Sequence, residues 1–256
     1  MDWLTVVILS IVQGITEWLP VSSSGHLAII QTIFNLNVPV FFDILLHLGS
    51  IAAVVFIFRE DIIKIITAVL RFDFKSEEGK LALFIIAASI PTAIIGFAFK
   101  SLFESFFTNL LAVGIALLVT GTFLFICERF SKNKELKLKD ALIIGAVQGI
   151  AIIPGISRSG STIGTGLLLG IDKEKAARFS FLLAIPAIVG ATIFDFSAAA
   201  ISSVGLQFAI AGIVLSALVS FFAIKWLLDI IKKQRFHWFA VYCWLIGLAV
   251  IVYTLV

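Results

Sequence analysis

Long apolar runs separated by short polar segments make up most of this sequence. A helix needs about 20 apolar residues to cross the ~30 Å hydrocarbon core of a bilayer. Six runs meet this length. They predict six transmembrane helices, at approximately 39–58, 81–99, 108–127, 178–198, 206–230 and 237–256.

Two further apolar regions, residues 2–36 and 139–170, are each interrupted midway by a cluster of proline, serine and glycine. Proline lacks a backbone donor and glycine adds backbone flexibility, so a continuous helix is disfavoured there. We expect each region to form a re-entrant helix-loop-helix that dips into the membrane and returns to the side from which it came. Irregular backbone at membrane depth must be satisfied by protein or water, so these loops should line a cavity.

The overall composition supports a membrane protein. Hydrophobic residues make up 61% of the chain and charged residues only 14%, and the mean hydropathy is +1.14. A soluble all-α domain of 256 residues needs more polar surface than this. We therefore expect an all-α polytopic membrane protein that contacts membrane lipids and binds no nucleic acid.

The two interrupted regions share a repeated motif. Residues 13–26 read QGITEWLPVSSSGH, and residues 148–162 read QGIAIIPGISRSGST. The shared Gln-Gly-Ile and Ser-x-Ser-Gly elements keep a constant offset of 135 residues, which indicates an internal duplication. The predicted repeats cover approximately residues 1–130 and 135–256 of one membrane domain that comprises the whole chain.

Each repeat would contain one re-entrant region, which does not change sides, followed by three spans. An odd number of crossings places the second repeat upside down relative to the first. In this topology Lys100 is the only lysine or arginine in the connections of one face. The other face carries four clusters of lysine and arginine, within residues 59–80, 129–139, 173–178 and 232–235. Basic residues favour the cytoplasmic side, so we expect these loops in the cytoplasm and both termini outside a plasma membrane.

Inverted re-entrant regions approach from opposite faces, so their loops can meet near the middle of the membrane. These loops are termed the first tip, residues 17–26, and the second tip, residues 152–162. Their hydroxyls and glycines resemble a phosphate cradle, in which backbone N–H groups and helix N-termini face an anion. The candidate phosphate-binding residues are Ser22, Ser24, Gly25, Ser157, Arg158, Ser159, Gly160 and Thr162.

The charged residues of the tips suggest hydrolysis of a phosphoanhydride. Arg158 offers a planar fork to two phosphoryl oxygens, and Glu17 is the candidate metal ligand. Ser23 is the candidate nucleophile, with His26 as the group that takes or returns a proton. Attack by His26 itself, or its activation of water, is an open alternative. A Glu17–Arg158 ion pair that only holds the repeats together is a simpler interpretation, but it leaves the hydroxyls unexplained.

Three polar residues outside the tips have less defined roles. Asp43 is interpreted as a helix-capping or interfacial acid. His47, in the first span, either lines a pocket or packs through a hydrogen bond. His237, beside Trp238, is interpreted as an interfacial anchor.

Over four longer motifs the chain resembles the undecaprenyl-diphosphatases of the BacA type. The motifs are TEWLPVSSSGH, LGSIAAVV, PGISRSGST and FSFLLAIPAIVGAT, and the resemblance runs from end to end. Members of this family are membrane enzymes that remove the terminal phosphate of the polyprenyl diphosphate carrier of cell-wall synthesis. The resemblance implies this substrate, two inverted repeats, a site open to the outer face and dependence on Mg²⁺ or Ca²⁺.

The resemblance also carries over to individual residues. It implies functional roles for the residues that match the family motifs, which are Glu17, Ser23, His26, Ser157, Arg158 and Thr162. One position departs from the pattern: Gln13 stands where many members have the first acid of an E-x-x-x-E motif. This departure removes one metal ligand and leaves the metal stoichiometry open.

Two other classes of function are alternatives to the enzyme. Inverted repeats with broken helices are the architecture of secondary transporters, so a transporter or flippase for an anionic lipid is the main alternative. A membrane scaffold would leave the buried ionisable residues unexplained. A homodimer is compatible with the sequence, which does not specify the oligomeric state.

Overall fold

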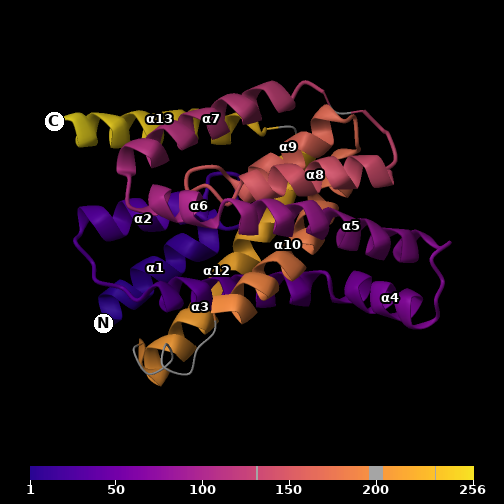
Figure 1. The fold of residues 1–256 in the computed structure, drawn as a ribbon, viewed down its shortest axis with the longest axis horizontal. Helices are drawn as coiled ribbons and strands as arrows, with labels where there is room; N and C mark the ends of the chain where they lie inside the picture. The colour runs from indigo at the N-terminus through magenta and orange to yellow at the C-terminus, as the bar shows by residue number, and fades with distance from the viewer. Residues whose placement is uncertain (131, 196–203, 234) are drawn as a thin grey trace.

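The computed structural model describes residues 1–130, 132–195, 204–233 and 235–256. In these ranges the chain forms twelve helices and no strand, which confirms the predicted all-α class (Figure 1). The helices are α1 (Trp3–Thr16), α2 (Ser23–Ile33), α3 (Val40–Ile57), α4 (Arg59–Leu70), α5 (Glu77–Ala98), α6 (Lys100–Phe107), α7 (Leu110–Cys127), α8 (Leu138–Ile150), α9 (Arg158–Leu168), α10 (Lys173–Asp195), α12 (Leu206–Lys232) and α13 (His237–Leu255).

Six of these helices, α3, α5, α7, α10, α12 and α13, are long and apolar enough to cross a membrane. They coincide with the six predicted spans. Helices α5 and α10 begin four and five residues before the predicted spans 81–99 and 178–198, because charged first turns extend each helix beyond its apolar run. The end of the span predicted at 178–198, from residue 196, lies outside the described residues.

The two interrupted regions are each divided into a pair of helices, as predicted. Helix α1 is followed by a loop and α2, and α8 is followed by a loop and α9. The backbone of Ser22 has φ of 69°, and that of Gly155 has φ of 95°, so each loop contains one residue with a positive φ that a right-handed helix does not use. The bounds of the first region agree with the prediction 2–36 and those of the second with 139–170, to within a few residues.

Two helices were not predicted. Helix α4 follows α3 directly, exposes Ile63, Ile66 and Leu70, and buries only Ala68. Helix α6 is eight residues long and follows α5. Both are amphipathic and too short to span a bilayer, so a search for long apolar runs does not detect them.

Small residues allow the long helices to approach closely, as is usual between membrane helices. Gly114 of α7 faces Gly247 of α13, where a Cβ added to Gly247 would lie 2.8 Å from the Gly114 carbonyl oxygen. Seven residues further along α7, Gly121 faces Ala240, which precedes Gly247 on α13. Helices α7 and α13 therefore run in opposite directions, side by side along the top of Figure 1.

Other helix pairs run in parallel. Helix α1 packs against α12 through Trp3 with Phe208 and, further along both helices, Gly14 with Val219. Helix α8 packs in the same sense against α5, because Gly145 contacts Ala88 and the later Gly149 contacts Ile95. Helix α12 also packs along α3, and α5 along α10. These contacts surround the two tips with helices from both halves of the chain.

The largest buried cluster lies beneath the first tip. Trp18 is fully buried and meets Phe181 of α10 edge to face, with ring centroids 5.4 Å apart. Leu19 and Val21 join the same cluster with apolar residues of α12 and α13. Apolar packing on Trp18, Leu19 and Val21 therefore fixes the backbone that presents the neighbouring polar residues.

Candidate functional site

The helices that begin at the two tips, α2 and α9, start in the same way. Ser22 precedes α2 and its Oγ accepts a hydrogen bond from the Gly25 N–H, at 3.3 Å. Ser157 precedes α9 and accepts in turn from the Gly160 N–H, at 3.1 Å. These serines cap the helix N-termini, a position that strongly favours serine. The predicted cradle residues are therefore brought to two helix N-termini, where N–H groups are concentrated.

The structure brings the two tips into direct contact. Ser22 Oγ also accepts from the Gly155 N–H, at 3.0 Å. A Cβ added to Gly25 would lie 3.0 Å from the Gly155 backbone, and one added to Gly160 would lie 3.1 Å from Pro20. These distances are shorter than most Cβ contacts, so a side chain at Gly25 or Gly160 would require the opposite tip to shift by a few tenths of an ångström. Ser159 adds a further link, since its Oγ donates to the Leu19 carbonyl at 3.1 Å.

Glu17 lies at the centre of the polar contacts and is only 6% exposed. Its Oε2 accepts from Ser23 Oγ at 2.6 Å and from Gln13 Nε2 at 2.9 Å. Its Oε1 accepts from Arg158 Nη2, across the junction between the tips. The arrangement joins an acid and a hydroxyl of the first tip to the cation of the second.

Arg158 is held in place but keeps a free donor. Its guanidinium carbon lies 5.1 Å from the centre of the Trp18 ring, in a cation–π contact. Its Nη1 is buried and has no hydrogen-bond partner within the part of the chain that the structure describes. A buried donor without a partner costs about 1–3 kcal/mol, so this nitrogen is available to donate to an oxygen atom of water or of a ligand. Trp18 was not predicted as a site residue, because an apolar side chain gives no chemical signal in the sequence.

His26 lies in the first tip but does not bond to Ser23. Its Nδ1 lies 2.7 Å from the Ser22 carbonyl, and its Nε2 lies 2.8 Å from the hydroxyl of Tyr242 on α13. The hydroxyl of Ser23 donates to Glu17 instead. The hydrogen-bond acceptor of Ser23 in this structure is therefore the Glu17 carboxylate and not the imidazole, and Tyr242 is a partner of His26 that sequence reasoning missed.

The hydroxyls of the second tip are mostly engaged within the protein. Thr162 Oγ1 donates to the Arg158 carbonyl at 2.8 Å, and it lies 2.5 Å from the hydroxyl of Ser180 on α10. Ser157 and Ser159 lie 3.3 Å apart between their hydroxyls, and Ser22 and Ser24 lie 3.4 Å apart in the same way. Of the predicted phosphate-binding side chains, Arg158 has the clearest unused capacity to bind an anion.

His47 belongs to the site and Asp43 lies next to it. His47 Nε2 is 3.3 Å from Glu17 Oε2, which places its imidazole beside the predicted site residues. Its Nδ1 lies 2.7 Å from the Asp43 carbonyl. The Asp43 carboxylate accepts from Gln31 Nε2 at 2.9 and 3.0 Å, in the first turn of α3. His237 lies apart, beside Glu128 at the start of α13.

Oxygen atoms beside Glu17 suit a hard divalent cation. Gln13 Oε1 is buried without a partner among the described residues, next to the amide nitrogen that binds Glu17. Carboxylate, amide and hydroxyl oxygens are the ligands that Mg²⁺ and Ca²⁺ prefer. Across the described ranges, no group of three or more His, Cys, Asp or Glu side chains is arranged to hold a metal. A cation bound beside Glu17 would therefore need water and substrate oxygens to complete its ligands.

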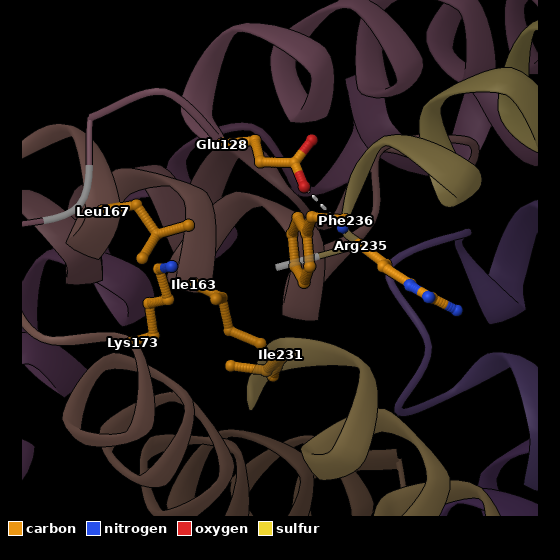
Figure 2. Close-up of a pocket in the computed structure, with 7 residues that line it drawn as sticks. All are labelled: Glu128, Ile163, Leu167, Lys173, Ile231, Arg235 and Phe236. Atoms are coloured by element: carbon orange, nitrogen blue, oxygen red, sulfur yellow. Dashed lines mark hydrogen bonds between the residues drawn. The ribbon is translucent and has the colours of Figure 1, made fainter. Parts of the chain in front are cut away.

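A small hollow lies elsewhere, between α9, α10, α12 and the start of α13 (Figure 2). It is lined by Glu128, Ile163, Leu167, Lys173, Ile231, Arg235 and Phe236. The Glu128 carboxylate accepts from the backbone N–H groups of Phe236 and His237, at 2.9 and 3.1 Å. This acid caps α13, and the hollow contains none of the predicted site residues.

The fold and the site define a class of protein: a multi-pass membrane protein with a buried, oxygen-rich and cationic site between two helix N-termini. Comparison with known proteins gives the family. The model of the bacitracin resistance protein BacA family matches residues 6–249, and the chain belongs to this family.

Relatives that are named undecaprenyl-diphosphatase match over nearly the full length. The protein of Carboxydothermus hydrogenoformans is 42% identical, covering 98% of this chain and 97% of the relative. That of Alkaliphilus metalliredigens is 44% identical, covering 97% and 98%. A relative from Methanobrevibacter smithii is 41% identical, covering 98% and 97%. The resemblance found in the sequence motifs is thereby confirmed.

Proposed function

We propose that this chain is an undecaprenyl-diphosphatase, which hydrolyses undecaprenyl diphosphate to the monophosphate and inorganic phosphate and so recycles the lipid carrier of cell-wall synthesis. Family membership and the names of the relatives support this activity. The structural observation that carries it is the arrangement around Glu17. The carboxylate binds a serine hydroxyl on one side and, on the other, an arginine with an unpartnered buried nitrogen.

Arg158 is proposed to bind the terminal phosphoryl group. Nη1 is free to donate to a phosphoryl oxygen, while the Glu17 contact and the Trp18 ring hold the guanidinium plane. Charge-assisted hydrogen bonds of this kind are about twice as strong as neutral ones. Backbone N–H groups at the start of α2 and α9 add to the positive field at the tips.

Ser23 is the proposed nucleophile. Its Oγ attacks the terminal phosphorus, and its proton passes to Glu17 Oε2, to which it is already hydrogen-bonded at 2.6 Å. The bond from this phosphorus to the bridging oxygen breaks, and its electron pair leaves with undecaprenyl monophosphate. Water then attacks the phosphoserine, releases inorganic phosphate and restores the hydroxyl. His26 is proposed as the group that takes or returns a proton in this second step.

A divalent cation, Mg²⁺ or Ca²⁺, is proposed as the cofactor. Glu17 would hold it, together with Gln13 Oε1, and the remaining ligands would be water and substrate oxygens. When bound, such a cation neutralises charge on the phosphoryl oxygens and on the departing phosphate. The protein ligands are few, so the cation should bind weakly in the absence of substrate.

Removing divalent cations is expected to lower phosphate release by about a hundredfold or more, since a metal supplies several kcal/mol of charge stabilisation. The measurement is phosphate release from undecaprenyl diphosphate by purified protein, with and without a chelator, followed by restoration with excess Mg²⁺ or Ca²⁺. Full activity in the chelator, after removal of bound metal has been verified by elemental analysis, would contradict the proposed cofactor.

The two halves of the chain are proposed to be inverted repeats that meet at re-entrant tips. Contacts separated by the repeat offset support this arrangement. Gly25 packs on Gly155, and Gly160, which corresponds to Gly25, packs on Pro20, which corresponds to Gly155. Helices α1 and α12 run in parallel, as do their counterparts α8 and α5. A two-fold axis in the membrane plane would also require the antiparallel pairing of α7 and α13.

The site itself is asymmetric within these repeats. Ser23 and Arg158 occupy corresponding positions, and both donate to Glu17. Glu17 corresponds to Ile152, so the acid occurs in the first copy alone. Duplication thus supplied two similar tips, and divergence gave the first a carboxylate and a nucleophile and the second a cation.

The basic loops are proposed to be cytoplasmic, with the termini and the opening of the site on the outer face of the plasma membrane. Both chain ends lie at the left of Figure 1, opposite the connection between α4 and α5 at the right. The basic clusters predicted to face the cytoplasm include residues 59–80, which contain that connection. This distribution supports the orientation because lysine and arginine favour the cytoplasmic side.

Cysteine labelling is expected to separate the two faces. In a background that lacks Cys127 and Cys243, a cysteine at exposed Asn133 should react with an impermeant maleimide only after the cells are opened, and one at exposed Thr108 should react in intact cells. The control is equal labelling of both variants in detergent. Reaction of both positions from the same side of intact membranes would contradict the proposed topology.

A further inference from the structure

His26 is buried and both nitrogens of its ring have partners. Nδ1 lies 2.7 Å from the Ser22 carbonyl oxygen, which can only accept, so Nδ1 carries a hydrogen. Nε2 is therefore the nitrogen at which the imidazole gains or loses a proton. That nitrogen lies 2.8 Å from the hydroxyl of Tyr242, a residue 216 positions away in the chain.

Helix α13 makes a two-part contact with the first tip. The rings of Tyr242 and His26 are stacked, with centroids 5.6 Å apart and planes 9° from parallel. The next residue, Cys243, is buried and its Sγ lies 3.7 Å from the Pro20 carbonyl. Two adjacent residues of α13, Tyr242 and Cys243, therefore contact the first tip and fix the register of the helix against it.

We propose that Tyr242 is a positioning residue of the catalytic site, which acts through His26 by stacking on its imidazole and hydrogen-bonding its Nε2. This proposal rests on the proposed function, in which His26 takes or returns a proton. It assigns to α13 a share in a site whose other residues lie on the tips and on α1 and α3.

A phenol hydroxyl suits this position because it is both a donor and an acceptor. When the imidazole is neutral, Tyr242 Oη donates to the Nε2 lone pair. When the imidazole is protonated, Nε2–H donates to Tyr242 Oη. The same partner thus satisfies His26 in both states, whereas a carboxylate, which can only accept, would favour the protonated one.

Tyr242 also lies at the border between the site and the surface of the protein. His26 is 8% exposed and Tyr242 is 39% exposed, so the phenol ring covers the imidazole on the side toward α13. Removing the hydroxyl leaves the ring in place but leaves Nε2 without its partner. Removing the ring as well opens that side of the imidazole.

The test compares Tyr242→Phe with Tyr253→Phe. These are the only two tyrosines of the chain, and both lie on α13, with Tyr253 56% exposed near its end. For Tyr242→Phe we expect kcat for undecaprenyl diphosphate to fall about tenfold, the value of one hydrogen bond, with KM changed less than about twofold. The pH dependence of kcat should shift as well. Tyr253→Phe should match the parent in all three quantities.

Two further measurements separate this role from a merely structural one. In a His26→Ala background, Tyr242→Phe should cause no additional loss, because both residues act through one imidazole. Nitrogen NMR of ring-labelled histidine should show a change in the Nε2 signal of His26 in Tyr242→Phe, with the thermal unfolding of the variant unchanged.

The outcomes distinguish failure of this inference from failure of the proposed function. An inactive parent protein would overturn the proposed function, and the NMR comparison would still decide the His26–Tyr242 contact. Parental kcat and an unchanged Nε2 signal in Tyr242→Phe, in an active enzyme that needs His26, would overturn the role of Tyr242. Equal, additive losses in the parent and His26→Ala backgrounds would also overturn it.

Discussion

The variant Arg158→Lys is expected to lose at least about a hundredfold in kcat/KM for undecaprenyl diphosphate, although it keeps the positive charge. In the structure one guanidinium nitrogen binds Glu17 while the other is buried and unpartnered within the described chain. A lysine ammonium is a point charge that cannot occupy both positions while keeping the contact of the guanidinium with the Trp18 ring. Transition-state charge on the phosphoryl oxygens would therefore lose its principal donor.

The matched control is Arg129→Lys. Arg129 is exposed and stacks on Phe125 with a similar separation of 5.1 Å, but it lies outside the tips. This control should keep parental activity, and both variants should be compared for phosphate release and thermal unfolding in the same detergent. A folded Arg158→Lys variant with near-parental turnover would reduce Arg158 to a counter-ion of Glu17.

Glu17→Gln is expected to abolish turnover, with a loss of about a thousandfold or more, because one substitution removes both the proton acceptor of Ser23 and the charged metal ligand. The amide has nearly the same shape as the carboxylate, so the side chain still fits its buried position. Phosphate release as a function of Mg²⁺ and Ca²⁺ concentration is the measurement. Metal-dependent turnover within tenfold of the parent would contradict both roles.

A companion variant, Gln13→Glu, should tighten the apparent affinity for the cation by adding a second carboxylate next to Glu17. The internal duplication provides its control. Gln148 corresponds to Gln13 in the other half of the chain and also has a buried amide oxygen without a partner among the described residues. Its amide nitrogen donates to Thr92 at 3.2 Å, away from Glu17, so Gln148→Glu should leave the metal response unchanged. If Gln13→Glu and Gln148→Glu both respond to the cation as the parent does, Gln13 does not face the ion.

The sequence specified the membrane helices well because their signal is local. About 20 apolar residues in a row predict a span, and the proline, serine and glycine clusters predict the loops that separate α1 from α2 and α8 from α9. Helices α4 and α6 were not predicted, because they are short and amphipathic. The starts of α5 and α10 were placed late because charged residues extend these helices beyond their apolar runs.

Which side chains pair with each other in the site was harder to predict than which residues form the site. The repeated motif placed Glu17 and Arg158 near each other, and the structure joins them. Sequence spacing favoured a Ser23–His26 pair, since three residues bring side chains to one face of a helix. In the structure Ser23 donates back to Glu17, at the end of α1, and His26 contacts Tyr242 of α13. The first turn of α2 thus has α1 beside Ser23 and α13 beside His26, so the two side chains find different partners. Tyr242 is 216 residues from its partner, and no local pattern reveals such a contact.

The most direct test of the central claim follows lipid and phosphate together in sealed vesicles. Purified protein is inserted into vesicles whose outer leaflet is loaded with undecaprenyl diphosphate, and the lipid products, the released phosphate and the leaflet distribution are measured over time. The enzyme account predicts one inorganic phosphate released and one undecaprenyl monophosphate formed for each diphosphate consumed, with neither product formed by Glu17→Gln. Movement of intact undecaprenyl diphosphate between leaflets without phosphate release would contradict that account and favour the transporter.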